Sequence, residues 1–179
     1  MSQNKKILFI LMPNFRDEEF YIPFNMLYEK GYILDVAGLQ EGEIIGANGY
    51  KHKADFLLDI LSHKDLENYD ALVIPGGPGS TTYLWNNPKI QEIIEFFNEK
   101  GKIVATICYA CIAPAQTGIL KNKKATVYPT AEAKKIFEEC NVIFDNTGIV
   151  VLENEKIITA QGPKFAREFG QEIINMLGS

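Results

Sequence analysis

The sequence predicts an α/β fold, a doubly wound sandwich in which helices cover both faces of a mostly parallel sheet. Short apolar runs, which are typical of buried parallel strands, alternate with amphipathic helical segments along the chain. No linker, repeat or low-complexity stretch interrupts this alternation. With 179 residues and 46% hydrophobic content, the chain is long enough to form a single domain, residues 1–179, around one core.

Periodicity and turn residues define the elements of the first half. The run that ends at Pro13 is continuously apolar, as in a buried strand. Phe20, Phe24 and Leu27 then recur at helical spacing before Gly31, a common residue after a helix end. The predicted elements are a strand at Lys6–Met12, a helix at Asp17–Lys30, a strand at Tyr32–Ala37, a hairpin within Glu41–Lys53 and a strand at Asp70–Ile74.

The second half continues the alternation. An amphipathic segment begins at Pro88 and closes at Gly101, and a final segment begins at Pro163, a residue favoured in the first turn of a helix. The predicted elements are a helix at Pro88–Glu99, a strand at Ile103–Ile107, a helix at Thr130–Cys140, a hairpin of Gly148–Leu152 and Lys156–Ala160, and a helix at Pro163–Leu177.

Composition excludes several classes of protein. The net charge of -5 argues against a nucleic-acid partner, which requires a clustered basic surface. No apolar run approaches the roughly 20 residues of a membrane helix, so we expect no membrane partner. The three cysteines form an odd set that fits a reducing compartment, which predicts a cytoplasmic location.

Cys108 is the most informative residue of the chain. It directly follows the predicted strand Ile103–Ile107 and begins a small-residue helix, so a sharp turn would present its side chain at the carboxyl edge of the sheet. Thr106 and Ala110 are small enough to flank such a nucleophile elbow, and a helix N-terminus favours the thiolate. On this residue alone, a reactive thiol and a buried, inert thiol are equally supported.

The other two cysteines are interpreted as structural. Cys108 and Cys111 form a C-x-x-C pair, but the pair falls past mid-chain, whereas a thioredoxin-like unit would carry it early. We expect Cys111 to pack as a small hydrophobic residue and Cys140 to be structural. One pair cannot supply the roughly four ligands of a zinc site, so we expect no metal and no cofactor.

Two further loops reach the same predicted edge. Gly76 and Gly77 lie between prolines after a strand, and their backbone N–H groups would form an oxyanion hole for a carbonyl attacked by Cys108. The alternative is a tight turn that only leads into the next helix. Glu19 lies in the first helical turn, where position alone favours a helix-dipole role. The sharper interpretation is a protonated carboxyl that hydrogen-bonds Cys108.

No histidine is placed beside Cys108 by the sequence. His52 and His63 both lie in the middle connection, so a Cys-His-Asp protease triad lacks an evident base.

Four motifs, in order, resemble those of the ThiJ/PfpI superfamily, which includes Parkinsonism-linked deglycase-type proteins, archaeal intracellular peptidases and bacterial stress proteins. The motifs span essentially the whole chain and are Asp17–Pro23 with Glu19, Asp70–Gly77, Ala105–Cys108 and Gly118–Thr126. The peptidase branch has His where this chain has Tyr109, and the deglycase branch often has His where this chain has Tyr128. Tyrosine, with a pKa of about 10, is a poor base but a good hydrogen-bond donor. Both tyrosines are therefore candidate substrate-binding residues.

The resemblance implies a flavodoxin-like sandwich, usually a homodimer, with an oxidation-prone cysteine held by a protonated glutamate. We therefore expect Cys108 to act as nucleophile, Glu19 to orient it and move a proton, and Gly76 and Gly77 to hold the oxyanion. The expected substrate is a small reactive carbonyl, such as a 2-oxoaldehyde or its protein adduct, in glyoxalase-like or deglycase-like stress defence. Two alternatives remain: a non-enzymatic cysteine redox sensor or chaperone, and an intracellular peptidase or amidase.

Overall fold

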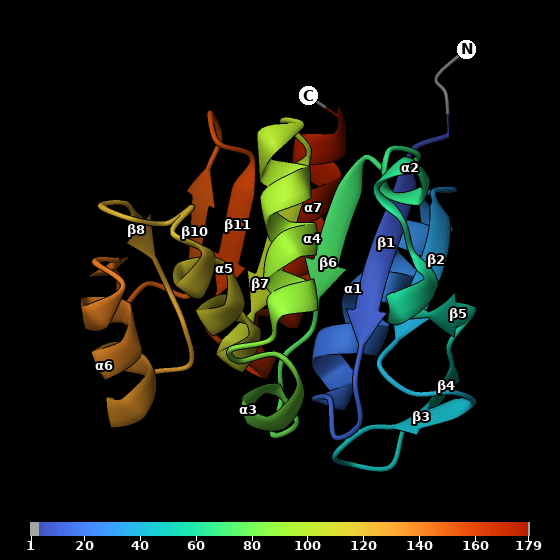
Figure 1. Ribbon diagram of the computed structural model, residues 1–179, viewed down its shortest axis with the longest axis horizontal. Coiled ribbons are helices and arrows are strands. Elements are labelled where there is room, and N and C mark those ends of the chain that lie inside the picture. The colour runs from blue at the N-terminus through green and yellow to red at the C-terminus, as the bar shows by residue number, and fades with distance from the viewer. Residues whose placement is uncertain (1–3, 179) are drawn as a thin grey trace.

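The computed structural model describes residues 4–178 and confirms the predicted α/β fold (Figure 1). A seven-stranded sheet has the order β10-β11-β7-β6-β1-β2-β5, in which β10 alone is antiparallel to its neighbour. The strands of this sheet are β1 (Lys6–Leu11), β2 (Ile33–Gly38), β5 (Phe56–Leu57), β6 (Ala71–Ile74), β7 (Ile103–Ile107), β10 (Ile149–Leu152) and β11 (Ile157–Ala160). Two small sheets pair β3 (Glu43–Ile45) with β4 (Lys51–Lys53) and β8 (Lys124–Ala125) with β9 (Ile143–Phe144).

Helices cover both faces of the main sheet (Figure 1). The helices are α1 (Asp17–Glu29), α2 (His63–Leu66), α3 (Ser80–Tyr83), α4 (Pro88–Glu99), α5 (Ile112–Thr117), α6 (Ala131–Glu139) and α7 (Ala166–Gly178). In Figure 1, α4 and α5 lie in front of the sheet, whereas α1 and α7 lie behind it. Helices α1 and α7 pack closely at Gly170, where an added Cβ would lie only 2.8 Å from the sulfur of Met26.

The core lies between these layers and is formed largely by the central strands. All residues of β6 and β7 are buried, as are all of β1 after Lys6. Such strands have apolar side chains on both faces, which explains why their sequences are continuous apolar runs rather than alternating ones. Among residues 4–178, no helix combines the length and apolar character needed to cross a bilayer.

Short elements account for the differences from the predicted layout. The segment expected to be one helix from Pro163 begins with a 3₁₀ turn at Pro163–Phe165, and α7 follows at Ala166. The segment between the first hairpin and β6 contains β5, a 3₁₀ turn at Leu58–Ile60 and α2, none of which has a strong periodic signal in the sequence. The two predicted hairpins are present as β3–β4 and β10–β11.

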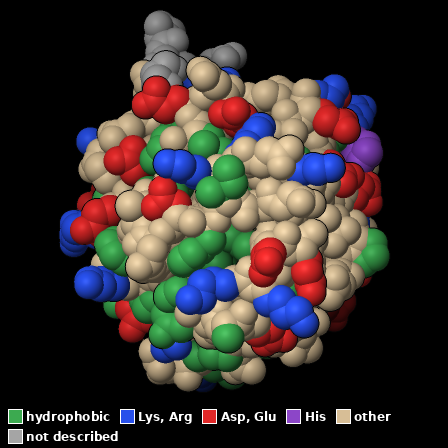
Figure 2. All heavy atoms as spheres, turned by 90° about the vertical axis from the view of Figure 1, so that its left-hand side faces the viewer, with side chains coloured by type: hydrophobic (Ala, Val, Ile, Leu, Met, Phe, Trp, Pro, Cys, Tyr) green, Lys and Arg blue, Asp and Glu red, His purple; other side chains and the backbone are tan. Residues whose placement is uncertain are grey.

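The free edge of the main sheet is partly covered by the second half of the chain. Figure 2 shows the side of the molecule that carries α6, β8 and β10, where hydrophobic side chains gather in patches between charged ones. The residues of β10, the edge strand, are half-buried, and β8 lies against this strand. Interspersed charge of this kind is a usual protection against pairing of sheet edges.

Candidate functional site

Parallel pairing of β1, β6 and β7 brings the three predicted loops to one edge of the sheet. Ile7 pairs with Ala71 and Ala71 with Ile103, so the three strands run in register and end together. In Figure 1 this edge lies at the bottom, beside α3 and the β3–β4 hairpin. Ligands of doubly wound folds bind beyond this edge.

Cys108 occupies the sharp turn that the sequence predicts. The residue has a φ of 60°, which is uncommon for a side chain other than glycine. It begins a 3₁₀ turn, Cys108–Cys111, that continues directly into α5. Its side chain is nearly buried, with 5% of its surface exposed. This geometry is a nucleophile elbow with sulfur in place of oxygen.

Glu19 points from the first turn of α1 toward this elbow and is fully buried. Its Oε2 accepts a 2.8 Å hydrogen bond from the backbone N–H of Gly76. The Cys108 thiol lies close enough to the same carboxyl for each group to shift the pKa of the other. The Glu19 Oε1 atom meets no donor in hydrogen-bond geometry among the described residues.

Burial controls the charge of the Glu19 carboxyl. Desolvation raises its pKa from 4.5 to about 8, although hydrogen bonds from Cys108 and Gly76 and the positive charge of Arg16 oppose the shift. The carboxyl therefore holds a proton at neutral pH. This charge state is the one that the sharper sequence interpretation requires.

The Cys108 thiol differs from the sequence expectation of a thiolate. Burial raises its pKa, and negative charge on Glu19 raises it further. Backbone hydrogen bonds from Tyr109 and Gly77 lower the pKa but do not cancel these effects. The expectation of a thiolate came from the helix N-terminus, and burial of the sulfur, which the sequence analysis gave as the alternative, acts in the opposite direction.

The two glycines after β6 make different contacts. The Gly76 N–H, which we expected to bind an oxyanion, donates to Glu19 and is therefore engaged. A Cβ at this position would lie 2.5 Å from the Ile107 carbonyl oxygen and 2.8 Å from the Cys108 Cβ, so only glycine fits. Gly77 has a φ of +112° and lies against the backbone of Arg16. Its N–H, with that of Tyr109, is directed at the sulfur.

An aromatic row extends from the elbow. The rings of Trp85, Tyr109 and Tyr128 contact one another edge to face at 5.8 and 5.5 Å, and the Trp85 indole N–H donates to the Tyr109 carbonyl. Tyr128 lines a pocket of about 470 Å³. The other residues of this pocket are Pro129, Gln161, Gly162, Pro163, Lys164 and Phe165. The structure thus places both candidate substrate-binding tyrosines on one path away from Cys108.

Neither histidine of the chain contacts the elbow. His52, on β4, packs against Phe20 and Phe24 at 4.8 and 5.4 Å, and burial lowers its pKa. His63, on α2, is exposed and pairs with Glu92 at 2.8 Å. Figure 1 places α2 at the opposite end of the sheet from the carboxyl edge.

Cys111 and Cys140, the two cysteines that we expected to be structural, lie in different surroundings. Cys111 is fully buried, accepts a hydrogen bond from Thr106 at 3.4 Å and contacts the Ala160 carbonyl at 3.6 Å. Cys140 is partly exposed at the end of α6. Among the described residues, no group of three or more His, Cys, Asp or Glu side chains is arranged to hold a metal ion.

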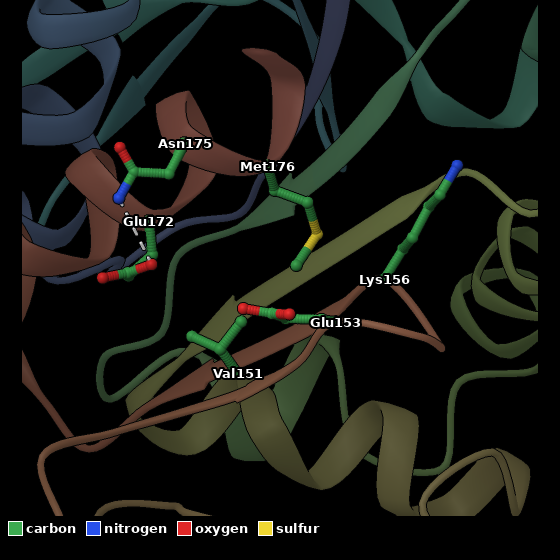
Figure 3. A pocket seen from close by; sticks show the side chains of 6 residues that line it. All are labelled: Val151, Glu153, Lys156, Glu172, Asn175 and Met176. Carbon is green, nitrogen blue, oxygen red and sulfur yellow. Dashed lines mark hydrogen bonds between the residues drawn. The ribbon is translucent and has the colours of Figure 1, made fainter. Parts of the chain in front are cut away.

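A second pocket, of about 200 Å³, lies between the β10–β11 hairpin and α7 (Figure 3). It is lined by Val151, Glu153, Lys156, Glu172, Asn175 and Met176. Because Ile157 pairs with Val104 at the beginning of β7, this pocket lies at the amino edge, whereas Cys108 follows the other end of that strand. It is therefore separate from the candidate site.

Asp17 supports the site in a way that the sequence analysis missed. Its carboxylate accepts hydrogen bonds from the backbone of Asn48 at 3.2 Å and Tyr50 at 3.0 Å. These bonds hold the β3–β4 hairpin against the start of α1. The sequence offered only an acidic residue in a first helical turn, which helix-dipole complementarity already explained.

A parallel-sheet α/β sandwich with a cysteine elbow beside a buried, protonated glutamate defines the class of this protein. The model of the DJ-1/PfpI family matches residues 5–176, and the chain belongs to this family. An uncharacterized protein of Methanocaldococcus jannaschii is 39% identical over 176 residues, covering 98% of this chain and 83% of that protein. Deglycase PfpI of Pyrococcus furiosus is 35% identical over 123 residues, covering 69% and 72%. The ThiJ/PfpI domain protein from Brachyspira murdochii superposes with a TM-score of 0.88 at 25% identity, covering 99% and 98%.

Proposed function

We propose that this protein converts small reactive carbonyl compounds, 2-oxoaldehydes or their protein adducts, through covalent attack by Cys108. One observation supports the proposal most directly: the strained elbow holds a thiol beside a fully buried carboxyl whose pKa is raised to about 8. A buried acid that is protonated near neutral pH can both give and accept a proton within one reaction. The similarity to a deglycase supports the same class of substrate.

The proposed reaction of a 2-oxoaldehyde is balanced without an external oxidant or reductant. The sulfur of Cys108 forms a bond to the aldehyde carbon, and the carbonyl oxygen gains a proton to give a hemithioacetal. Glu19, once ionised, removes the hydrogen of that carbon as a proton, and a proton is returned to the neighbouring carbon. The first carbon is thereby oxidised to a thioester and the second reduced to an alcohol. Water then cleaves the thioester, which releases a 2-hydroxycarboxylate and restores the thiol.

The groups around the sulfur fit the charge that develops in this sequence. The N–H groups of Gly77 and Tyr109 are directed at the sulfur, so they are the donors that we assign to the developing oxyanion in place of Gly76. Tyr109 follows the nucleophile directly, which is the usual position of an oxyanion donor at such an elbow. The pocket beside Tyr128 would accept the substituent of the carbonyl compound.

The test is turnover of methylglyoxal, with lactate measured as the product. We expect Cys108→Ser to lose at least about 100-fold in kcat/KM and Glu19→Gln to lose a similar amount, because each removes a reacting group. Cys140→Ser is the matched control and should keep wild-type activity. Equal activity of wild type and Cys108→Ser would contradict the proposal.

A redox sensor or chaperone remains the second candidate, because the same buried carboxyl could hold an oxidised cysteine. Mass spectrometry after limited peroxide treatment would show oxygen addition at Cys108 before Cys140. Stable oxidation of Cys108 in a protein without methylglyoxal turnover would favour this function. Because Cys140 is more exposed than Cys108, preferential reaction at Cys108 could not be explained by access alone.

The geometry does not favour a peptidase or amidase. Such enzymes need a base with a pKa near neutrality beside the thiol, and the position after Cys108 is occupied by Tyr109. We expect little or no hydrolysis of casein or peptidyl-coumarin substrates. Hydrolysis that is lost in both Cys108→Ser and one of the two histidine variants would overturn this assignment.

We further propose a homodimer in the cytoplasm. Tyr21 and Tyr28 lie seven residues apart on one face of α1, and Tyr50 packs on Tyr21 at 5.3 Å. Tyr28 is 69% exposed and nearby hydrophobic residues of β3–β4 are also exposed, so this surface could bury apolar area in a second copy. A cytoplasmic location fits the three free thiols. Light scattering of the purified protein tests the dimer.

A further inference from the structure

Arg16 presents an unpaired guanidinium beside the candidate site. It immediately precedes α1 and is tied by its backbone to the site residues on both sides. Its N–H donates to the Gly76 carbonyl at 2.9 Å, and its own carbonyl accepts from the Glu19 N–H at 3.1 Å. Its side chain is close enough for its charge to influence the Glu19 carboxyl.

The side chain of Arg16 makes no ion pair or hydrogen bond with the residues that the structure describes, and its Nε atom is buried without a partner. This is unexpected in a chain of net charge -5. The adjacent acidic residues do not explain it. Asp17 is engaged by the β3–β4 hairpin, and Glu18 forms none of the ion pairs of the described residues. A buried donor without an acceptor costs free energy unless a ligand supplies one.

The choice of arginine is itself informative. The 18 basic residues of the chain are all lysines apart from Arg16 and Arg167. Lysine carries a compact, strongly hydrated charge, whereas the planar guanidinium matches the two oxygens of a carboxylate. One of the two arginines therefore lies where its charge acts on the Glu19 carboxyl of the candidate site.

We propose that Arg16 is a specificity-determining residue that binds a carboxylate group of the substrate, so that the site favours 2-oxoaldehydes that carry a carboxylate. The part of this inference that concerns turnover rests on the proposed carbonyl chemistry, whereas the binding of a carboxylate by Arg16 does not. Arg16 would contact a substituent of the substrate rather than the reacting carbon. Its loss should therefore raise KM for a charged substrate more than for a neutral one.

The binding step can be tested without any turnover, through alkylation of Cys108. In this reaction the sulfur displaces iodide from the methylene carbon, so that an S–C bond forms, the C–I bond breaks and the thiol proton passes to solvent. The two reagents differ in one group, because iodoacetate carries a carboxylate where iodoacetamide carries a neutral amide. We expect Arg16→Gln to lower the ratio of iodoacetate to iodoacetamide rates at Cys108 by about tenfold, the size of one charge-assisted hydrogen bond.

Arg167→Gln is the matched control, because it removes the same charge from an exposed position on α7. It should leave the alkylation ratio at Cys108 unchanged, and the ratio at Cys140 should be unaffected by either variant. Arg16→Lys should restore part of the ratio, since it keeps the charge but loses the planar pair of donors.

Turnover forms the second arm. For 4,5-dioxopentanoate, a 2-oxoaldehyde with a carboxylate, Arg16→Gln should raise KM about tenfold, whereas KM for its neutral methyl ester should not change. If no carbonyl compound is turned over but the alkylation ratio depends on Arg16, the proposed function fails and the carboxylate site stands. An unchanged ratio in Arg16→Gln, an equal change in Arg167→Gln, or a changed oligomeric state of Arg16→Gln by light scattering would overturn the carboxylate site.

Discussion

At the scale of single residues, the site is a pair of acids whose protons are coupled. Glu19 and Cys108 share a buried space, so ionisation of either one disfavours ionisation of the other. Burial of the carboxyl is complete, whereas the sulfur retains slight exposure and two backbone donors. The carboxyl and the thiol therefore titrate as a coupled pair, and the environment of both groups determines which of them loses a proton first.

Variants of Glu19 should test the coupling between the carboxyl and the Cys108 thiol. Glu19→Gln keeps a neutral donor and removes the charge that raises the thiol pKa, so this pKa should fall or stay unchanged. Glu19→Asp shortens the side chain by one methylene, which should weaken the contact and expose the pair to water. The measurement is the ultraviolet absorbance of the thiolate against pH, with Cys108→Ser as the blank.

A rise in the thiol pKa in Glu19→Gln would contradict the coupled pair, because a neutral amide cannot repel the thiolate. An identical titration in wild type and both variants would show that Cys108 behaves as an isolated buried thiol.

At the scale of elements, α1 is the part of the fold that connects packing to the site. It carries Glu19 at one end and is held by α7, where Gly170 leaves room for Pro23 and Met26. A Cβ on Gly170 would lie 3.2 Å from the Pro23 Cα, which is backbone and cannot rotate away. The distance between the two helices is therefore set by the absence of a side chain at this position.

Gly170→Leu should destabilise the protein by about 1–3 kcal/mol, because a large side chain must push α1 from the sheet. The same displacement should move Glu19 and reduce the reactivity of Cys108. Gly178→Ala is the matched control on α7, since nothing lies within 4 Å of its added Cβ, and it should change stability by less than about 0.5 kcal/mol. Urea unfolding gives both values, and equal midpoints for the two variants would contradict this view of the contact.

The strongly patterned elements were predictable from the sequence because burial on both faces produces continuous apolar runs, as in β1 and β7. Elements of two to four residues, such as β5 and α2, were missed because no periodicity develops over so short a length. The positions of Glu19 and Cys108 at one edge followed from the parallel topology. The direction of the Gly76 N–H could not be predicted from the topology, since it depends on where the buried Glu19 carboxyl lies.

At the scale of the whole molecule, the buried carboxyl links folding stability to pH. The pKa of Glu19 is about 8 in the folded protein against an ordinary value of 4.5, so the folded state retains a proton that the unfolded state has lost across this interval. The stabilisation is complete below the unfolded value and is lost as pH rises through the folded value. His52 acts in the opposite direction, because its lowered pKa reduces stability only as pH falls below about 6.5.

The free energy of unfolding should therefore decrease from pH 6.5 to pH 8. Over this interval the equilibrium constant for unfolding should rise by at most about tenfold for each pH unit. Urea titrations of wild type and Glu19→Gln measure this directly, because the amide cannot ionise and its curve should be flat over the same interval. His52→Gln serves as the comparison and should keep the wild-type slope above pH 6.5. A wild-type slope that persists in Glu19→Gln would assign the proton to another group, and a flat wild-type curve over this interval would mean that Glu19 is ionised in the folded protein. In that second case the carboxyl could not supply the proton that the proposed attack on a carbonyl requires.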